Sequence, residues 1–141
     1  MNKIDLKCIE CTRNKIIKFE ENKSKVTFHN LSQKEYECIR VDGCAITDGI
    51  RCDYLLRRSE EELEYFIELK GCNVGHAIDQ LRASIKQLSA DVTKKAKMAF
   101  VISTKPYPLT NSTVQLAMKE FKTKFNSLLL VKRTPYIHNL P

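Results

Sequence analysis

Three residues on two neighbouring apolar segments have the chemistry of metal-dependent hydrolysis. Asp53 lies in segment 51–55, and Glu68 and Lys70 lie in segment 65–71. Two carboxylates supply the hard oxygen ligands that Mg²⁺ or Mn²⁺ prefers. An ammonium can orient or deprotonate a water molecule, or stabilise a charged transition state. A metal held in this way polarises a phosphate and helps to generate hydroxide. The residue types therefore predict a phosphodiester-hydrolysing site.

The strand period predicts that Glu68 and Lys70 act together. Alternate residues of a strand share one face of the sheet, so Glu68 and Lys70 are expected side by side. Leu69, between them, points the other way, toward the core or a helix, while its backbone carbonyl is a candidate metal ligand. Asp53 can meet Glu68 if the two strands that carry them pair.

A turn signal predicts the register of the strand that precedes Asp53. Asp48-Gly49 suits the positive φ angles of a type I′ hairpin turn. Such a turn places Cys44 opposite Asp53, and it puts Asp42 on the same sheet face as Asp53. Asp42 is therefore a candidate accessory member of the site.

The apolar patterning predicts one α/β domain with a central mixed β-sheet flanked by helices. We expect residues 1–35 to form an N-terminal extension, 36–131 the core and 132–141 an irregular tail that contains two prolines. The extension shows weak helical spacing up to Phe19, a charged break, and a short strand at 26–29. The core elements are expected as strands 36–46, 51–57 and 63–69, helix 74–88, strand 98–103, helix 112–125 and strand 128–131.

This arrangement resembles the core motif of the PD-(D/E)xK nuclease superfamily, which has the restriction-endonuclease-like fold. The likeness covers roughly residues 36–103 and consists of a strand, a turn, Cys52-Asp53, a strand ending in Glu68-Leu69-Lys70, and a helix. It implies that Asp53 and Glu68 occupy the metal-ligand positions and Lys70 the lysine position. It also implies a Mg²⁺ or Mn²⁺ cofactor and a nucleic-acid substrate. Cys52 stands where the family often has proline.

Two other features of the family match less well. Some exonuclease-like branches have a glutamine and, four residues later, a tyrosine on the helix after the lysine. Gln80 fits the glutamine, but Ser84 replaces the tyrosine, so Gln80 is only an accessory candidate. Many members also carry an acidic residue on a helix before the first strand. Its candidates here are Glu10, Glu20, Glu35 and Glu37.

The charge balance favours an anionic partner. The net charge is +7 and the pI is near 9.1, and nucleic acid is the commonest partner of such proteins. His76, at the start of a helix, is an accessory candidate that could approach a phosphate. A solvated basic surface is the alternative interpretation. The residues proposed to follow a nucleic-acid backbone are Arg82, Lys86, Lys94, Lys95 and Lys97.

The six cysteines are expected to be thiols. The chain has no apolar run long enough to cross a bilayer and no signal-peptide pattern at its start, which predicts a cytoplasmic protein in a reducing compartment. Cys44, Cys52 and Cys72 lie in apolar contexts and are expected in the core. Cys8 and Cys11 form a CxxC pair that, with Cys38 and Cys44, could bind zinc, but the spacing of the second pair fits poorly.

The sequence thus predicts a metal-dependent nuclease that acts as a homodimer or is targeted by a partner protein. One alternative is a catalytically silent module of the same fold that binds nucleic acid or a protein. In that case Asp53, Glu68 and Lys70 should be spread apart or engaged in ion pairs, since alternating charges on a strand commonly form cross-strand pairs. A second alternative is a zinc-stabilised interaction protein.

Overall fold

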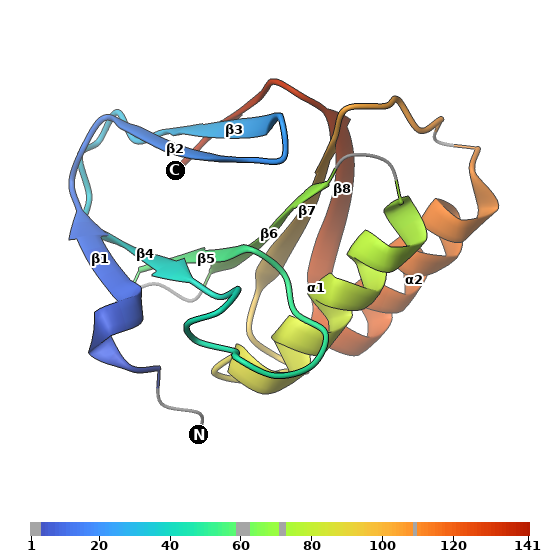
Figure 1. The fold of residues 1–141 in the computed structure, drawn as a ribbon, viewed down its shortest axis with the longest axis horizontal. Helices are drawn as coiled ribbons and strands as arrows, with labels where there is room; N and C mark the ends of the chain where they lie inside the picture. Colours follow the sequence, from blue (N-terminus) through green and yellow to red (C-terminus); the bar gives the residue numbers. More distant parts are fainter. Residues whose placement is uncertain (1–3, 59–62, 71–72, 109) are drawn as a thin grey trace.

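The protein is an α/β structure in which a mixed sheet is covered on both faces (Figure 1). The computed structural model spans residues 1–141 and describes all of them except 1–3, 59–62, 71–72 and 109, and the side chain of Lys70. Two helices pack on one face of the large sheet, and a second, smaller sheet lies across the other face. The expected α/β class and mixed central sheet are confirmed.

The large sheet has six strands in the order β1-β4-β5-β6-β7-β8. Neighbours from β1 to β6 pair antiparallel, while β6, β7 and β8 pair parallel through helical crossovers. From β4 to β8, the order of strands and helices agrees with the sequence prediction. The elements are η1 (Leu6–Cys8), β1 (Ile9–Thr12), β4 (Tyr36–Arg40), β5 (Tyr54–Arg57), β6 (Glu64–Lys70), α1 (Val74–Leu88), β7 (Lys97–Ser103), α2 (Ser112–Phe125) and β8 (Ser127–Arg133).

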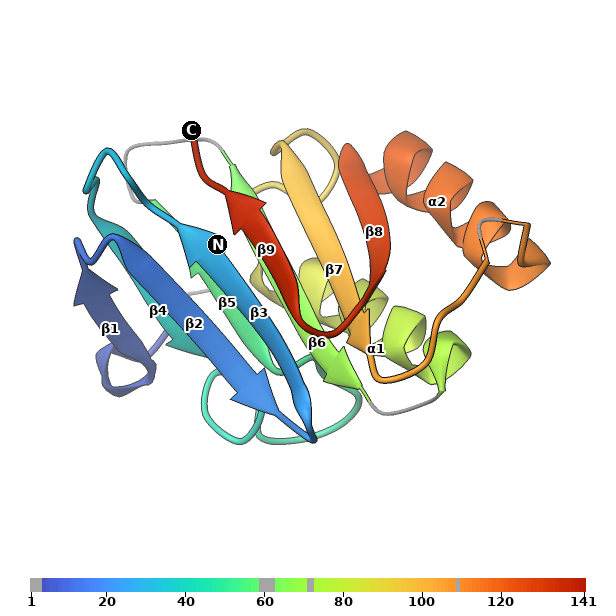
Figure 2. The ribbon, with the colours of Figure 1, turned by 90° about the horizontal axis from the view of Figure 1, so that it is seen from above.

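The small sheet joins the two ends of the chain, as the view from above shows (Figure 2). It contains β2 (Ile16–Glu21), β3 (Ser24–His29) and β9 (Tyr136–Asn139). Strands β2 and β3 form a hairpin, and β9 pairs parallel with β3. The weak helical spacing expected before Phe19 and the irregular tail expected after residue 131 were therefore wrong. Strands β2 and β3 alternate buried and more exposed residues, with Ile17, Phe19, Val26 and Phe28 in the core between the sheets. In β9, Tyr136 packs against the same core while Ile137 is exposed.

Strand β6 separates two hydrophobic cores. Phe66 faces the helices, whereas Tyr65, Ile67 and Leu69 face the small sheet. All four side chains are almost completely buried, and burial of an apolar side chain of this size contributes about 1.5–3 kcal/mol. The expectation that Leu69 points into the core is confirmed, and that core lies between the two sheets.

The connection from β4 to β5 differs from the expected hairpin. Arg40 pairs with Tyr54, and the N–H groups of Val41 and Asp42 both donate to the carbonyl of Asp53, at 3.0 and 3.3 Å. Asp53 therefore lies opposite Val41, not opposite Cys44. Gly49 does have a positive φ, but so does Gly43, and the chain already turns at Gly43 to form a loop over residues 41–53.

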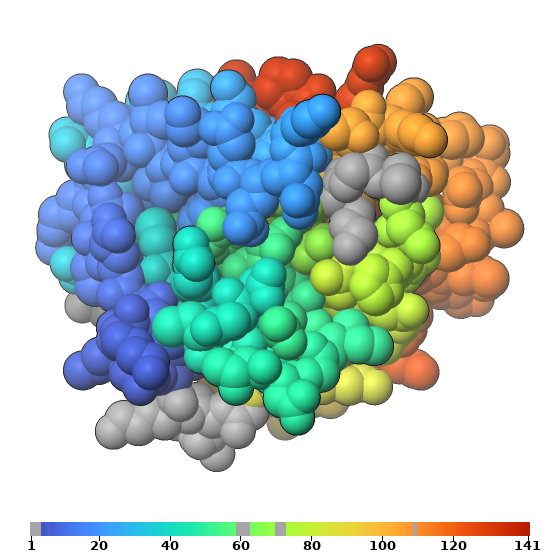
Figure 3. Space-filling view, in the orientation of Figure 1, coloured from blue at the N-terminus to red at the C-terminus, as the bar shows by residue number. Residues whose placement is uncertain are grey.

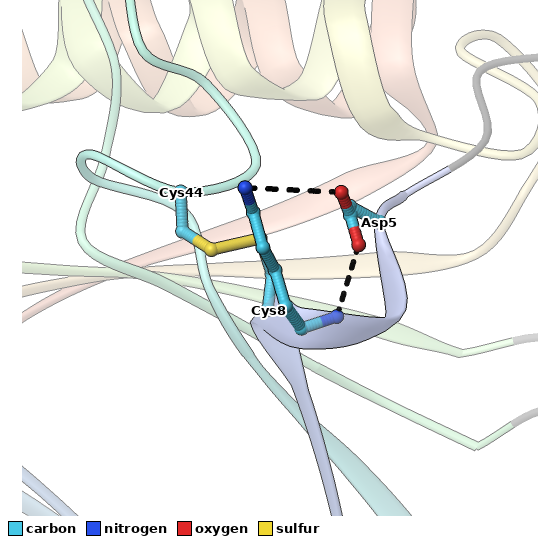
Figure 4. The surroundings of a disulfide bond; sticks show 4 residues. Asp5, Cys8 and Cys44 are labelled. Carbon is cyan, nitrogen blue, oxygen red and sulfur yellow. Dashed lines mark hydrogen bonds and ion pairs between the residues drawn. A yellow bond between two sulfur atoms is a disulfide. The ribbon is translucent and has the colours of Figure 1, made fainter.

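Cys8 and Cys44 form a disulfide, which corrects the expectation that the cysteines are thiols (Figure 4). The bond ties η1 to the loop between β4 and β5, and it removes two of the four thiols that the zinc alternative required. Cys52 is a buried thiol, as expected, and burial raises its pKa to about 12. Cys72 lies outside the described residues.

A buried pair of opposite charges occupies the amino end of β6. Glu64 and Lys97 are neighbours across β6 and β7, and they are 1% and 2% exposed. The Glu64 carboxylate accepts hydrogen bonds from the Ser89 hydroxyl at 2.6 Å and the Ala90 N–H at 3.0 Å. The Lys97 ammonium donates to four backbone carbonyls at 2.6–3.0 Å, those of Asp91, Val92, Lys95 and Phe125. Lys97 thereby fastens the end of α2 and the 91–95 loop to the sheet.

No helix in the described ranges is long and apolar enough to cross a bilayer.

The substitution Lys97→Met should destabilise the protein by about 3 kcal/mol, because it leaves several buried carbonyls and the Glu64 carboxylate without their cation. Urea denaturation followed by circular dichroism measures this loss. The matched control is Lys94→Met in the same loop, where the side chain is exposed and the change should stay within about 0.5 kcal/mol. Equal midpoints for both variants would contradict the anchoring role.

The substitution Cys8→Ala should lower the free energy of unfolding by about 3–4 kcal/mol, because the two bonded cysteines are 36 positions apart and a cross-link of that span restricts the unfolded chain. Cys11→Ala, which removes an exposed free thiol, should have no effect. The same urea titration, without reductant, compares the two variants. Alkylation of all six cysteines in the unreduced, unfolded protein would show that the bond is absent.

Candidate active site

Asp53 is held at the carboxyl end of β6 by two backbone interactions. Its N–H donates to the carbonyl of Ile67 at 3.1 Å, and its carboxylate Oδ2 accepts from the N–H of Leu69 at 2.8 Å. Asp53 thus extends the β5–β6 ladder past the end of β5. The carboxyl of Glu68 hydrogen-bonds to that of Asp53, and the two residues are 6% and 1% exposed. The two strands, β5 and β6, pair, which was the condition for Asp53 to meet Glu68.

The β2–β3 hairpin brings a third carboxyl group to this point. Its two-residue turn, Asn22-Lys23, has φ angles of 51° and 65°, and it lies beside the end of β6. The Asn22 amide donates to the carbonyl of Leu69 at 3.4 Å. Glu21, the last residue of β2, hydrogen-bonds to Asp53. Three carboxyl groups from three different strands therefore meet.

The pKa shifts follow from this crowding. Burial and then the charge of Asp53 raise the pKa of Glu21. Burial also raises the pKa of Asp53, although hydrogen bonds from the Leu69 N–H, Glu21 and Glu68 oppose the rise. Carboxyl groups that hydrogen-bond to each other must share protons. Glu21 and Asp53 therefore keep protons at pH values where ordinary carboxyl groups have lost them.

The three carboxyl groups are of a kind that suits a hard cation, but they are not arranged around a cation position. Carboxylate oxygens are the ligands that Mg²⁺ and Mn²⁺ prefer. Among the described residues, no group of three or more His, Cys, Asp or Glu side chains is arranged to hold a metal ion. Capping of the Leu69 N–H gives Asp53 a structural role, but it gives no reason for Glu21 and Glu68 to meet there.

Two further predicted site residues belong to the same end of β6. The Leu69 carbonyl belongs to β6 and accepts the weak hydrogen bond from Asn22 described above. The backbone of Lys70 ends β6 and pairs with Ser103 of β7. The side chain of Lys70, and with it the predicted catalytic ammonium, lies outside the described part of the chain.

The three accessory candidates are less close to the cluster than predicted. Asp42 is half exposed and its carboxylate forms an ion pair with Arg51 at 2.8 Å. Its backbone N–H bonds the Asp53 carbonyl, but its carboxylate acts on the Asp53 carboxyl only through its charge. His76 is exposed in the first turn of α1. Gln80 donates to the carbonyl of Arg51 at 3.0 Å, and its buried Oε1 accepts no hydrogen bond from the described residues.

The predicted nucleic-acid contacts were partly wrong. Lys97 is buried, and Arg82 is engaged by Glu120 and Asp79 at 2.6–2.8 Å. The other three are Lys86, Lys94 and Lys95, in the last turn of α1 and in the loop before β7. Because β7 runs parallel to β6, this loop lies at the opposite end of the sheet from Glu68, and the four strand positions from Glu64 to Glu68 alone span roughly 13 Å.

Glu21 was missed by sequence reasoning, although a signal existed. The four acidic candidates before the first core strand did not include it, and one of these, Glu37, pairs with Arg57 at 2.8 Å. Alternating apolar residues on both sides of Asn22-Lys23 indicate a hairpin, and asparagine tolerates the positive φ that such a turn needs. That pattern would have placed Glu21 beside the turn.

No protein-family model, curated protein or solved structure gives a significant match to this chain.

The substitution Glu21→Gln should raise the melting temperature by about 2–4 °C at alkaline pH, because it removes one of the mutually repelling charges yet keeps a donor for Asp53. The ordinary carboxyl pKa values are 3.8 for Asp53 and 4.5 for Glu21, and both are raised in the folded protein. At pH values below these ordinary pKa values, the two carboxyl groups are protonated in both the folded and the unfolded protein. The gain in melting temperature should therefore vanish near pH 4 and grow as the pH rises.

Differential scanning fluorimetry across this pH range makes the comparison, with Glu20→Gln as the control. Glu20 is the exposed neighbour on the same strand, and its substitution should leave the melting temperature unchanged at every pH. Destabilisation by Glu21→Gln at alkaline pH would contradict the repulsive cluster.

Proposed function

We propose that this protein is a metal-dependent nuclease that hydrolyses phosphodiester bonds of nucleic acid, with the restriction-endonuclease-like fold that its sequence motif suggests. The observation that carries the proposal is the meeting of Glu21, Asp53 and Glu68 at the carboxyl end of the central strand β6. Perturbed carboxyl groups that converge at such a position are characteristic of functional sites. The carboxyl ends of parallel strands are also where ligands bind in open α/β sheets.

Mg²⁺ or Mn²⁺ is the proposed cofactor. Asp53 and Glu68 would hold it, with Glu21 and the Leu69 carbonyl as further oxygen donors. Such an ion supplies Lewis acidity and lowers the pKa of a bound water molecule. Binding requires the carboxyl groups to give up the protons they share, so occupancy should increase with pH.

The residues of the chain have distinct parts in this proposal. Burial of Asp53 and Glu68 lowers the local dielectric constant and would strengthen the attraction of their carboxylates for the cation. The Leu69 N–H keeps the Asp53 carboxylate aimed at the end of β6. Lys70 follows Glu68 by two positions, and we propose that its ammonium orients the attacking water or stabilises the transition state, as the sequence motif implies.

The catalytically silent alternative predicts separated carboxylates, and the Asp53–Glu68 contact argues against it. Nucleic acid, either DNA or RNA, remains the proposed partner, and a homodimer or a partner protein would supply targeting. The cytoplasmic location expected from the sequence stays a prediction, and the Cys8–Cys44 disulfide argues against a strongly reducing compartment.

Purified protein with Mg²⁺ or Mn²⁺ should cleave at least one of four labelled substrates: single-stranded or duplex DNA, or single-stranded or duplex RNA. Asp53→Asn, Glu68→Gln and Lys70→Ala should each lower the rate about 100-fold or more, because each removes a proposed metal ligand or the proposed general acid–base group. Chelation with EDTA should abolish cleavage. Gel electrophoresis of the end-labelled products measures the rates.

Asp48→Asn is the matched control, since Asp48 is an exposed carboxylate in the same loop as Asp53. It should cleave at the wild-type rate. Melting temperatures of all variants at or above that of the wild type exclude loss of folding as the cause. Absence of cleavage with either metal on every substrate, or full activity of Glu68→Gln, would overturn the proposal.

A further inference from the structure

A groove of about 680 Å³ runs between the two sheets and opens beneath the β2–β3 hairpin (Figure 3). Its floor is the face of β1, β4 and β5 that the small sheet only partly covers, and its roof is β2. Strand β2 is an edge strand of the small sheet, so the groove follows an open edge. Its size is that of a site for a small molecule or a few units of a linear polymer.

The groove is lined by cations, aromatic rings and polar groups. Lys7, Lys18 and Arg40 contribute three positive charges, and Glu10 and Glu20 contribute two negative ones. Phe19 and Tyr54 contact each other on the side that leads to β5, with ring centroids 4.8 Å apart and ring planes tilted by 37°. A cationic groove that presents aromatic rings is the usual means of binding single-stranded nucleic acid.

The groove leads to the carboxyl cluster. Arg40 lies opposite Tyr54 and hydrogen-bonds to its hydroxyl, and both residues line the groove. The same two residues interact electrostatically with Glu21. Lys18 is three residues from Glu21 along β2, roughly 10 Å. A strand lying in the groove with a phosphate on Lys18 would therefore bring the next phosphates to Arg40 and then to the cluster.

We propose that this groove binds one strand of a single-stranded nucleic acid and delivers it to the carboxyl cluster. The choice of nucleic acid as the ligand rests on the proposed nuclease function. The existence of the groove and its lining does not depend on that function. A recess between two sheets admits a single strand, whose bases are free to stack on Tyr54, better than it admits the broad outer surface of a duplex. Lys18 and Arg40 are the phosphate contacts.

The test measures the binding of fluorescein-labelled oligonucleotides in EDTA, where no cleavage occurs, by fluorescence anisotropy at several salt concentrations. The double variant Lys18→Ala/Arg40→Ala should bind single strands about tenfold more weakly, and its salt slope should fall by about 1.4, because two phosphate contacts are lost. The control Lys119→Ala/Lys122→Ala removes the same charge from the exposed face of α2 and should bind like the wild type.

Three outcomes would overturn the inference: equal loss in both double variants, duplex bound as tightly as single strands, or displacement of the oligonucleotide by an equal concentration of poly-glutamate peptide. Two further results distinguish failure of the nuclease proposal from failure of the groove proposal. If binding depends on Lys18 and Arg40 but no cleavage occurs in Mg²⁺ or Mn²⁺, the nuclease proposal is wrong and the proposal of a binding groove stands. If Lys18→Ala/Arg40→Ala cleaves with an unchanged KM, the nuclease proposal stands and the proposal of a binding groove is wrong.

Discussion

Strand β6 is hydrogen-bonded along both edges and buried on both faces, and the rest of the structure depends on this double burial. Such a strand must be apolar on both faces, and Tyr65, Phe66, Ile67 and Leu69 meet that requirement. The helices cover one side and the small sheet covers the other. Any charged residue on β6 must therefore be neutralised within the protein or placed where the strand ends.

Buried charges have different surroundings at the two ends of β6. At the amino end, Glu64 has Lys97 beside it and hydrogen-bond donors on both oxygens. At the carboxyl end, the Asp53 carboxylate meets the carboxyl groups of Glu21 and Glu68. The first arrangement stabilises the fold, whereas the second stores electrostatic repulsion. Proteins retain such repulsion where function requires it, so the contrast within one strand supports the assignment of the site to the carboxyl end.

The predictable parts of the structure were those in which local pattern and burial agree. The continuous apolar run of β6 and the helical stripe of α1 gave the correct elements, and the meeting of Asp53 with Glu68 followed from them. The β4–β5 register was wrong because it rested on Asp48-Gly49 alone, while Gly43 and the Cys8–Cys44 bond shape the loop. The hairpin beside Glu21 had a local signal, but the approach of Glu21 to Asp53 and the pairing of β9 with β3 join distant segments, which no local pattern reports.

The parallel pairing of β3 with β9 has a consequence for biosynthesis. Strand β9 comes from the end of the chain and lies next to β3, in the hairpin that carries Glu21. The ribosome releases the N-terminal part first. The β2–β3 hairpin therefore lacks its neighbouring strand β9 until residues up to Asn139 have emerged. The nascent chain can form β4 to β7 earlier, but the small sheet closes over β6 last. The small sheet that covers the carboxyl cluster is therefore complete only after Asn139 has emerged.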